Sequence, residues 1–211
     1  MTTQEKNGIT EGVIWKQLLI FFFPILVGSF FQQLYNTVDS VIVGQFVGKE
    51  ALSSVGGSAG QIISLVVGFF TGVSTGATVI ISQYFGAGKK EEIEESLHTA
   101  YAFALVGGLV LGIAGIVFAP QMLRWMNTPE ELIAESVLYV RVYFSGLIFI
   151  FIYNMGAAIL RAVGDSKRPL YYLIVCSVVN IILDLLLILV IPLGVLGAAI
   201  ATLIAQAVSA V

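Results

Sequence analysis

Charged residues are scarce in this 211-residue chain, since only 11% of its residues are Asp, Glu, Lys or Arg and 58% are hydrophobic. The mean hydropathy is +0.97. A soluble domain of this length would expose more polar surface, whereas apolar windows of roughly 20 residues match the hydrocarbon thickness of a bilayer. The composition therefore indicates a polytopic membrane protein. The net charge of −3 gives no reason to expect a nucleic-acid partner.

Cysteine and histidine each occur only once. The lone Cys176 excludes an intrachain disulfide, and the lone His98 excludes zinc motifs that pair two histidines. Glycine-rich segments at 56–60 and 72–76 lack the Lys of a phosphate-binding loop, so we expect neither ATP nor another cofactor. The sequence offers no candidate His or Lys base for Ser177 or Cys176. We therefore do not expect an enzyme.

Hydrophobic runs predict an all-α bundle of six transmembrane helices. The expected spans are about 14–46, 54–84, 97–118, 137–160, 169–190 and 195–211. Between the third and fourth spans, residues 119–135 are predicted to form a short interfacial helix.

The basic residues divide unequally between the two sides of this topology. The N-terminal side carries Lys6, Lys16, Lys89, Lys90, Arg161, Lys167 and Arg168, and the other side carries Lys49, Arg124 and Arg141. Because cytoplasmic loops are enriched in Lys and Arg, we expect a cytoplasmic N-terminus.

The last residues, 205–211, are still apolar and have no basic flank. We therefore expect residues 1–211 to be an N-terminal six-helix lobe, truncated before the C-terminal lobe of a two-lobed transporter. A complete six-helix protein is the alternative.

Two carboxylates, Asp39 and Asp184, lie inside long apolar stretches. An ionisable side chain at the bilayer centre costs at least ~2.5 kcal/mol on insertion scales, so it normally faces a protein interior and marks an ion or proton path. These two residues are the first candidates for function.

Four of the predicted spans direct oxygen-bearing side chains to one helix face, at spacings of three, four or seven residues. These side chains are Gln32, Asn36 and Asp39 in the first span, Asn154 in the fourth, Ser177, Asn180 and Asp184 in the fifth, and Thr202, Gln206 and Ser209 in the sixth. Na⁺ prefers such oxygens, and a proton needs only a carboxylate of suitable pKa. Either ion suits the pattern. Interhelical hydrogen bonding without a ligand, at ~0.6 kcal/mol per contact, is the alternative.

Small residues recur every four positions in the second span, at Gly56, Gly60, Ser64, Gly68, Gly72 and Gly76. Such a stripe predicts close packing against a neighbouring helix. Gly108 and Gly112 repeat the pattern more weakly in the third span.

Pro24, inside the first span, deprives the Ile20 carbonyl of its amide partner, which predicts either a static kink or a hinge.

These motifs together resemble the N-terminal lobe of the multidrug and toxic compound extrusion (MATE) family, over nearly the whole chain. The resemblance rests on Pro24, Gln32 and Asp39, on 43–44 and 51–56, on Gly72, Gly76, Gln83 and 86–88, on 160–165 with Pro169, and on Asn180, Asp184 and 197–202. Ala162 departs slightly from the family, in which many members have Gly after the Arg.

The resemblance implies a twelve-helix antiporter in the bacterial or archaeal cytoplasmic membrane. Such an antiporter exports organic compounds in exchange for Na⁺ or H⁺, and we expect those compounds to be cationic. By position, it implies cation-binding roles for Asp39, Asn180, Asp184 and Thr202, with Asn154 nearby. The resemblance also implies that Pro24 is the hinge of the first helix.

Gln33, Tyr35 and Tyr153 are candidates for the substrate path. Arg161 and Asp165 are assigned to a loop, as a structuring pair or a gate. Arg141 is then the only arginine expected inside the bundle. Two alternatives stay open. A lipid-linked oligosaccharide flippase of the same superfamily would want a more cationic cavity, and a non-transporting binding module would have no need of Asp39 and Asp184.

Overall fold

The computed structural model describes residues 13–210, except for the side chain of Ile14, and all regular elements in that range are helical. The α-helices are α1 (Ile14–Ile42), α2 (Lys49–Gly56), α3 (Ser58–Gly86), α4 (Lys90–Trp125), α5 (Glu130–Ser145), α6 (Leu147–Ala162), α7 (Lys167–Asp184) and α8 (Val195–Ala210). Two π-helical segments, η1 (Val43–Val47) and η2 (Leu185–Val190), continue α1 and α7. The predicted all-α fold is confirmed.

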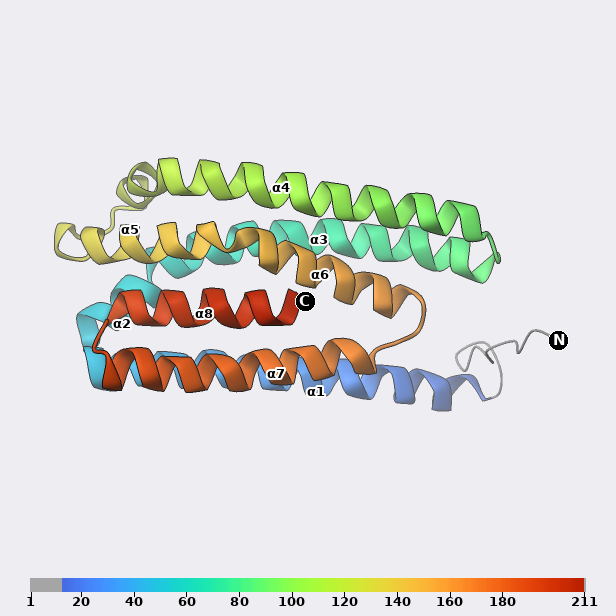
Figure 1. The fold of residues 1–211 in the computed structure, drawn as a ribbon, viewed down its shortest axis with the longest axis horizontal. Helices are drawn as coiled ribbons and strands as arrows, with labels where there is room; N and C mark the ends of the chain where they lie inside the picture. The colour runs from blue at the N-terminus through green and yellow to red at the C-terminus, as the bar shows by residue number, and fades with distance from the viewer. Residues whose placement is uncertain (1–12, 211) are drawn as a thin grey trace.

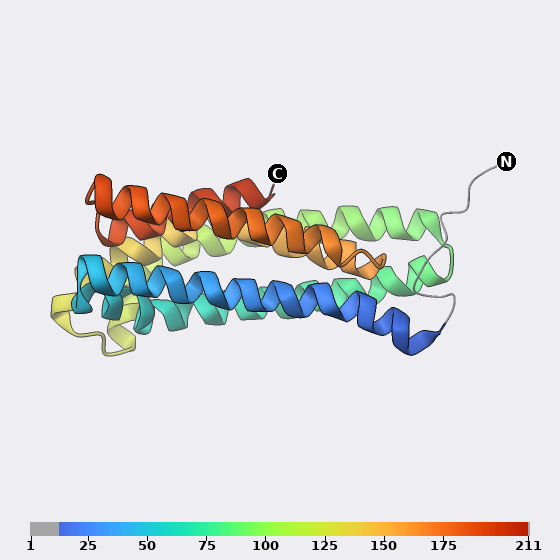
Figure 2. The same cartoon turned by 90° about the horizontal axis from the view of Figure 1, so that it is seen from below.

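The helices run roughly along one long axis (Figure 1). α7 packs between α1 and α8, and α8 also contacts α5 and α6. The outer layer is formed by α3 and α4, which pack on each other and on α6. Seen from below, α1 and α7 again lie side by side (Figure 2). The α3–α4 and α6–α7 connections lie at the end of the bundle where α1 begins.

The described helices occupy the positions of the six predicted spans. Four of them are long and apolar enough to cross a bilayer, namely those at Trp15–Val47, Lys49–Gly86, Lys90–Trp125 and Lys167–Val190. Helices α5 and α6 meet this criterion together, with a bend of 50° between them. α8 is apolar and shorter, with 16 residues. The chain is thus a multi-pass membrane protein.

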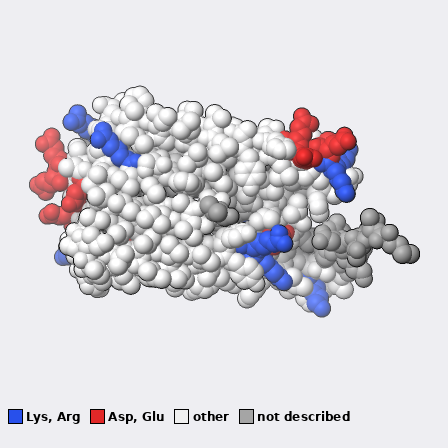
Figure 3. Space-filling model, in the orientation of Figure 1, with Lys and Arg blue, Asp and Glu red and all other residues white. Residues whose placement is uncertain are grey.

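The charges support this placement. On the face seen in Figure 3, basic and acidic side chains gather at both ends of the bundle, and one further basic group lies inward from the right-hand end. The broad surface between that group and the left-hand end is uncharged. Lys6 lies outside the described residues. An uncharged belt with charged ends matches a chain whose middle lies in hydrocarbon.

The predicted interfacial helix over 119–135 is wrong. α4 continues through Pro120 to Trp125, and α5 begins at Glu130 after a short turn. Ala119 and Leu123 are fully buried, so packing holds this segment in line with the rest of α4. The break in this part of the chain comes instead at Gly146, where a Cβ would lie 3.0 Å from Leu203 Cγ of α8.

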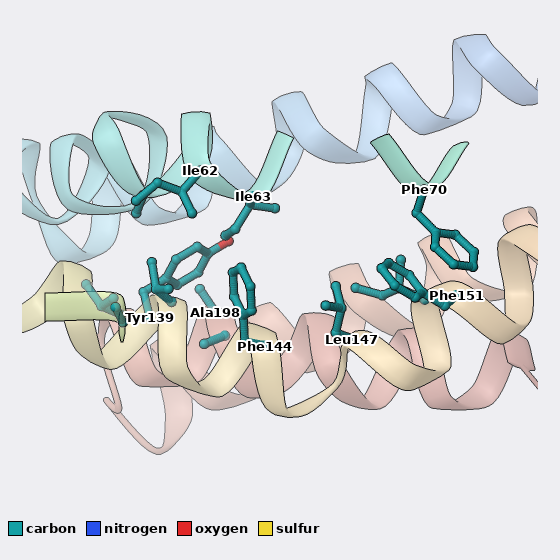
Figure 4. Close-up of a cluster of buried hydrophobic side chains, with 14 of the residues drawn as sticks. Ile62, Ile63, Phe70, Tyr139, Phe144, Leu147, Phe151 and Ala198 are labelled. Carbon is teal, nitrogen blue, oxygen red and sulfur yellow. The ribbon is translucent and has the colours of Figure 1, made fainter. Parts of the chain in front are cut away.

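The core lies between α3, the α5–α6 pair and α8 (Figure 4). At one end Phe70 of α3 stacks on Phe151 of α6, with ring centroids 3.6 Å apart and planes 11° from parallel. Tyr139, Phe144 and Leu147 continue the core along the chain. This packing fixes α5 and α6, and through them the position of α8.

The glycine stripe that packs helices together is not the one expected. Within residues 13–210, nothing lies within 4 Å of a Cβ built at Gly56, Gly68, Gly72 or Gly76 of α2 and α3. The weaker repeat in α4 makes the contacts. A Cβ at Gly108 would lie 2.8 Å from Ile148 Cα, one at Gly112 would lie 2.9 Å from the Phe144 carbonyl oxygen, and one at Gly115 would overlap the Phe144 ring. Close approach therefore occurs between α4 and the α5–α6 pair.

Candidate functional site

The two membrane carboxylates lie next to each other because α1 packs along α7. Asp184 is fully buried, and Asp39 is half-buried. Their carboxyl groups lie close enough to repel each other when both are ionised. A proton on one of the two would remove this repulsion, since an ionised carboxylate only accepts hydrogen bonds and a protonated one can donate. A bound cation would relieve the same repulsion between two negative charges.

Helix α8 adds neutral oxygen groups to this pair. Asn180, one turn before Asp184 on α7, donates through Nδ2 to Thr202 Oγ1 of α8 at 3.5 Å. Both side chains are buried. Ser177, in contrast, donates its hydroxyl hydrogen to the Leu173 carbonyl of its own helix at 2.8 Å. Asn180 and Thr202 thus join the acidic pair, while the Ser177 hydroxyl proton is used within α7.

The buried oxygens of this region lack donors. Within the described residues, no hydrogen-bond partner reaches Asp39 Oδ1, Asn180 Oδ1, Asp184 Oδ1 and Oδ2, or Gln206 Oε1. Buried polar atoms are normally hydrogen-bonded, so a cluster of buried acceptors without donors is unusual. A monovalent cation or a proton would satisfy it. Among residues 13–210, no three His, Cys, Asp or Glu side chains come together.

Both acid-bearing helices change to π-helical geometry just beyond their carboxylates. η1 begins four residues after Asp39, and η2 begins directly after Asp184. π-helical turns are rare and occur frequently at functional sites. Gly197 lets α8 approach η2, since a Cβ there would lie 3.0 Å from the Leu187 carbonyl oxygen.

A cavity of about 260 Å³ lies between α1, α3, α6, α7 and α8. Several residues with roles expected from the sequence line it, namely Pro24, Gln32, Tyr35, Tyr153, Asn154, Arg161 and Gln206. Tyr143 and Cys176 line it as well and were not expected there. Asp39 and Asp184 are outside the lining.

The other predicted site residues divide between the cavity wall and the exposed surface. Asn154 lines the cavity and donates Nδ2 to the Ile150 carbonyl oxygen at 2.8 Å. Gln33 is exposed and does not line the cavity, whereas Tyr35 and Tyr153 do. Pro24 is buried within a continuous α1, and it borders the cavity.

Tyr139 and Tyr143 were missed by the sequence reasoning. Tyr139 interacts electrostatically with both Asp39 and Asp184, and Tyr143 lines the cavity. They lie four residues apart on α5, with ring centroids 6.2 Å apart. That spacing was the available signal, but aromatic pairs in membrane spans usually belong to the core.

The expected Arg161–Asp165 pair does not form. Asp165 Oδ2 pairs with Arg168 Nε at 3.1 Å, and Asp165 Oδ1 accepts from the amides of Lys167 and Arg168. Asp165 is therefore the N-terminal cap of α7, and Arg161 turns to the cavity. Arg141 is not the internal arginine, since it is exposed and donates Nε to the Ile116 carbonyl oxygen.

Comparison with known proteins agrees with the fold described above. The family model MatE matches residues 24–186. The chain is 34% identical over 208 residues to the probable multidrug resistance protein YoeA of Bacillus subtilis, covering 97% of this chain and 44% of YoeA. It is 34% identical over 203 residues to the probable multidrug resistance protein YpnP of the same organism, covering 95% of this chain and 45% of YpnP.

Among solved structures, the chain is similar to an outward-facing multidrug resistance MATE family transporter of the MOP superfamily. The TM-score is 0.91 at 27% identity, and the match covers 100% of this chain and 46% of that one. The chain thus spans less than half the length of the proteins it matches.

Proposed function

Because this chain belongs to the MatE family, a family of transporters and not of enzymes, we propose that it is one lobe of a secondary active efflux transporter. The whole transporter would export organic compounds in exchange for Na⁺ or H⁺. The chain covers 46% of a MATE transporter structure, so a C-terminal lobe of the same protein would complete the transport path. Two similar lobes facing each other are a common transporter architecture.

One observation carries the coupling part of the proposal, namely the donor-free oxygens around Asp184. In the described part of the chain, the buried oxygens without donors are both carboxylate oxygens of Asp184, Oδ1 of Asp39, and the amide oxygens of Asn180 and Gln206. A site of this kind is stabilised by a cation, and it is destabilised when empty. Asp39, Asn180, Asp184 and Thr202 form the proposed cation site, with Na⁺ as the candidate metal ion. Asn154 lies on the cavity wall beyond it.

Coupling follows from the position of α1. Asp39 and Pro24 are on this one helix, and Pro24 borders the cavity. Proline removes one helical hydrogen bond and permits bending. Cation binding at Asp39 would hold α1 against α7, and cation release would free it to bend at Pro24. The shape of the cavity would change with it, so that cation and organic compound compete.

The lipid surroundings and orientation are part of the same proposal. The α1 start, the α3–α4 connection and the α6–α7 connection lie at one end of the bundle (Figure 1), and they carry Lys16, Lys89, Lys90, Arg161, Lys167 and Arg168. The start of α2, the end of α4 and helix α5 carry Lys49, Arg124 and Arg141 towards the other end. This excess supports a cytoplasmic N-terminus in the plasma membrane of a bacterium or archaeon.

Two alternatives are less well supported. A scaffold without transport would have no need of a buried pair of carboxylates, which is costly in a membrane. A lipid-linked oligosaccharide flippase must bind a pyrophosphate, and among the described residues a single guanidinium, that of Arg161, lines the cavity.

The test is efflux of a fluorescent organic dye from proteoliposomes that contain the full-length protein. Na⁺ and H⁺ gradients are imposed separately on wild type, Asp184→Asn and the exposed-carboxylate control Glu130→Gln. We expect one gradient to drive efflux in wild type and in the control, and not in Asp184→Asn. Efflux that is equal in all three proteins would reject the cation site, and a folded wild type without efflux under either gradient would reject the transporter.

A further inference from the structure

In the part of the chain that the structure describes, the cavity between α1, α3, α6, α7 and α8 is lined by one formal charge, and that charge is positive. Among the described residues that line it, Arg161 is the only Lys, Arg, Asp or Glu. The other polar lining side chains are neutral hydroxyls, amides and phenols, plus the thiol of Cys176. The carboxylates Asp39 and Asp184 lie outside the lining. A compound in this cavity therefore meets a cationic and aromatic wall.

The Arg161 guanidinium has no counter-ion among the described residues. It is half-buried in the last turn of α6, and residues 13–210 give it neither an ion pair nor a hydrogen bond. Its nearest acidic neighbour in sequence, Asp165, is already engaged by Arg168 and by the first amides of α7. Tyr153, which donates to the Pro169 carbonyl oxygen at 3.3 Å, interacts with it electrostatically.

A partly desolvated guanidinium is stabilised by an oxyanion. Its five N–H donors form a planar fork that matches a carboxylate or phosphate group in a bidentate manner, and such charge-assisted bonds are stronger than neutral ones. An organic cation in the same place would be repelled by Arg161 and would leave its donors unpaired. The cavity therefore favours the opposite charge from the one expected from the resemblance.

The neutral part of the wall favours an aromatic body. Tyr35, Tyr143 and Tyr153 line the cavity together, and aromatic side chains pack well against the rings of a ligand. The volume of about 260 Å³ lies near the lower end of the roughly 300–1,000 Å³ usual for ligand pockets. One lobe thus has room for a compound of one or two rings.

We propose that Arg161 binds the oxyanion group, carboxylate or phosphate, of an aromatic substrate in this cavity. This inference rests on the proposed transport function and assigns its substrate class. The oxyanion end is distant from the cation site, because Lys167 and Asp184 lie at opposite ends of α7, about 25 Å apart at 1.5 Å per residue. Substrate binding at Arg161 and cation binding at Asp184 can therefore be measured separately.

The experiment compares two probes of the same shape and opposite charge, 2-naphthoate and 2-naphthylmethylammonium. Their binding to the full-length protein is measured by calorimetry in phosphatidylcholine nanodiscs, for wild type, Arg161→Gln and Arg161→Lys. Arg168→Gln is the matched control, because this exposed arginine at the start of α7, seven residues after Arg161, already pairs with Asp165. Thermal unfolding of each variant establishes that it is folded.

We expect wild type to bind naphthoate at least about 10-fold more tightly than the ammonium probe, as charge-assisted hydrogen bonds predict. Arg161→Gln should lose that preference, Arg161→Lys should keep part of it, and Arg168→Gln should keep all of it. Equal binding of the two probes, or naphthoate binding unchanged in a folded Arg161→Gln protein, would overturn the proposal.

Two further arms distinguish a lipid from a substrate, and substrate binding from ion coupling. If phosphatidylglycerol added to the nanodiscs displaces naphthoate, the oxyanion at Arg161 is a lipid phosphate, and the substrate assignment is overturned. Asp184→Asn should bind naphthoate as wild type does, so its binding is independent of ion coupling. A protein that binds naphthoate through Arg161 but shows no gradient-driven efflux would refute the proposed function and leave this site in place.

Discussion

The side-chain amide of Asn180 on α7 donates to the hydroxyl of Thr202 on α8 at 3.5 Å, while the Asn180 amide oxygen has no donor within the described residues. The hydrogen bond fixes which end of the amide faces α8. It leaves the oxygen end free for a ligand, one turn from the Asp184 carboxylate. Two helices are thus linked at the point where the proposed cation would bind.

Replacing Thr202 by Val should weaken cation binding without unfolding the protein. Valine has a similar shape but no hydroxyl, so the Asn180 amide loses its acceptor and its orientation. Loss of a positioning partner of this kind typically lowers ion affinity about 10–100-fold. The ion concentration that gives half-maximal dye efflux measures the effect. Thr202→Ser should behave as wild type, and so should Ser209→Ala, whose hydroxyl donates within α8. A wild-type ion dependence in Thr202→Val would contradict the role given to this hydroxyl.

Replacing Pro24 by Ala should stabilise α1 and slow transport. Alanine restores the amide that the Ile20 carbonyl lacks, and a proline inside a helix costs ~3 kcal/mol relative to alanine. We expect a higher melting temperature together with a slower efflux rate, at unchanged cation affinity. Melting is followed by tryptophan fluorescence. Faster or unaltered efflux in a more stable variant would show that Pro24 is a static kink.

The two glycine patterns should respond differently to a methyl group. Gly108→Ala should destabilise the protein by ~1–3 kcal/mol, because its Cβ would meet the backbone of Ile148 at 2.8 Å in a packed interface. Gly72→Ala has open space, and alanine in a helix gains ~0.5–1 kcal/mol over glycine. Thermal unfolding of the full-length protein compares the two. If Gly72→Ala is as harmful as Gly108→Ala, the α3 stripe packs against a surface outside the described residues.

Asp165→Ala should destabilise the start of α7 by ~0.5–2 kcal/mol, as expected for a lost N-terminal cap. The carboxylate accepts from two backbone amides at 3.1 Å each. Arg168→Gln, which removes only the ion pair with the exposed Arg168 side chain, should cost less than ~1 kcal/mol. Chemical denaturation gives both values. Equal losses in the two variants would show that the ion pair, and not the cap, stabilises the turn.

The sequence predicted the helices well, because their hydrophobic length and turn residues are local properties. The span boundaries shifted by a few residues at most ends, and Gly146 was missed as the break in the fourth span. That break depends on the close approach of Leu203 from α8, which no local pattern contains. The prediction of an interfacial helix was wrong for a similar reason. Burial of Ala119 and Leu123 keeps α4 continuous through Pro120.

Pairwise placement was harder to predict than composition. Asp39 and Asp184 could be selected because carboxylates are rare in apolar segments, and the structure brings them together. The partners of Arg161, Asp165 and the glycine stripes depend on which helix faces which. A period of four in α3 and in α4 looks the same in sequence, yet among the described residues the α4 glycines meet α5 or α6, whereas Gly68, Gly72 and Gly76 of α3 have no neighbour within 4 Å.

The central claim is that Asp39 and Asp184 form the ion-coupling site. Infrared difference spectroscopy of the full-length protein detects carboxyl protonation directly, whichever ion couples. We predict that adding Na⁺ or changing the pH alters a buried carboxyl signal in wild type, and that this change disappears in Asp39→Asn and in Asp184→Asn but persists in Glu130→Gln. An identical spectral change in wild type and in the folded Asp39→Asn/Asp184→Asn double variant would contradict the account.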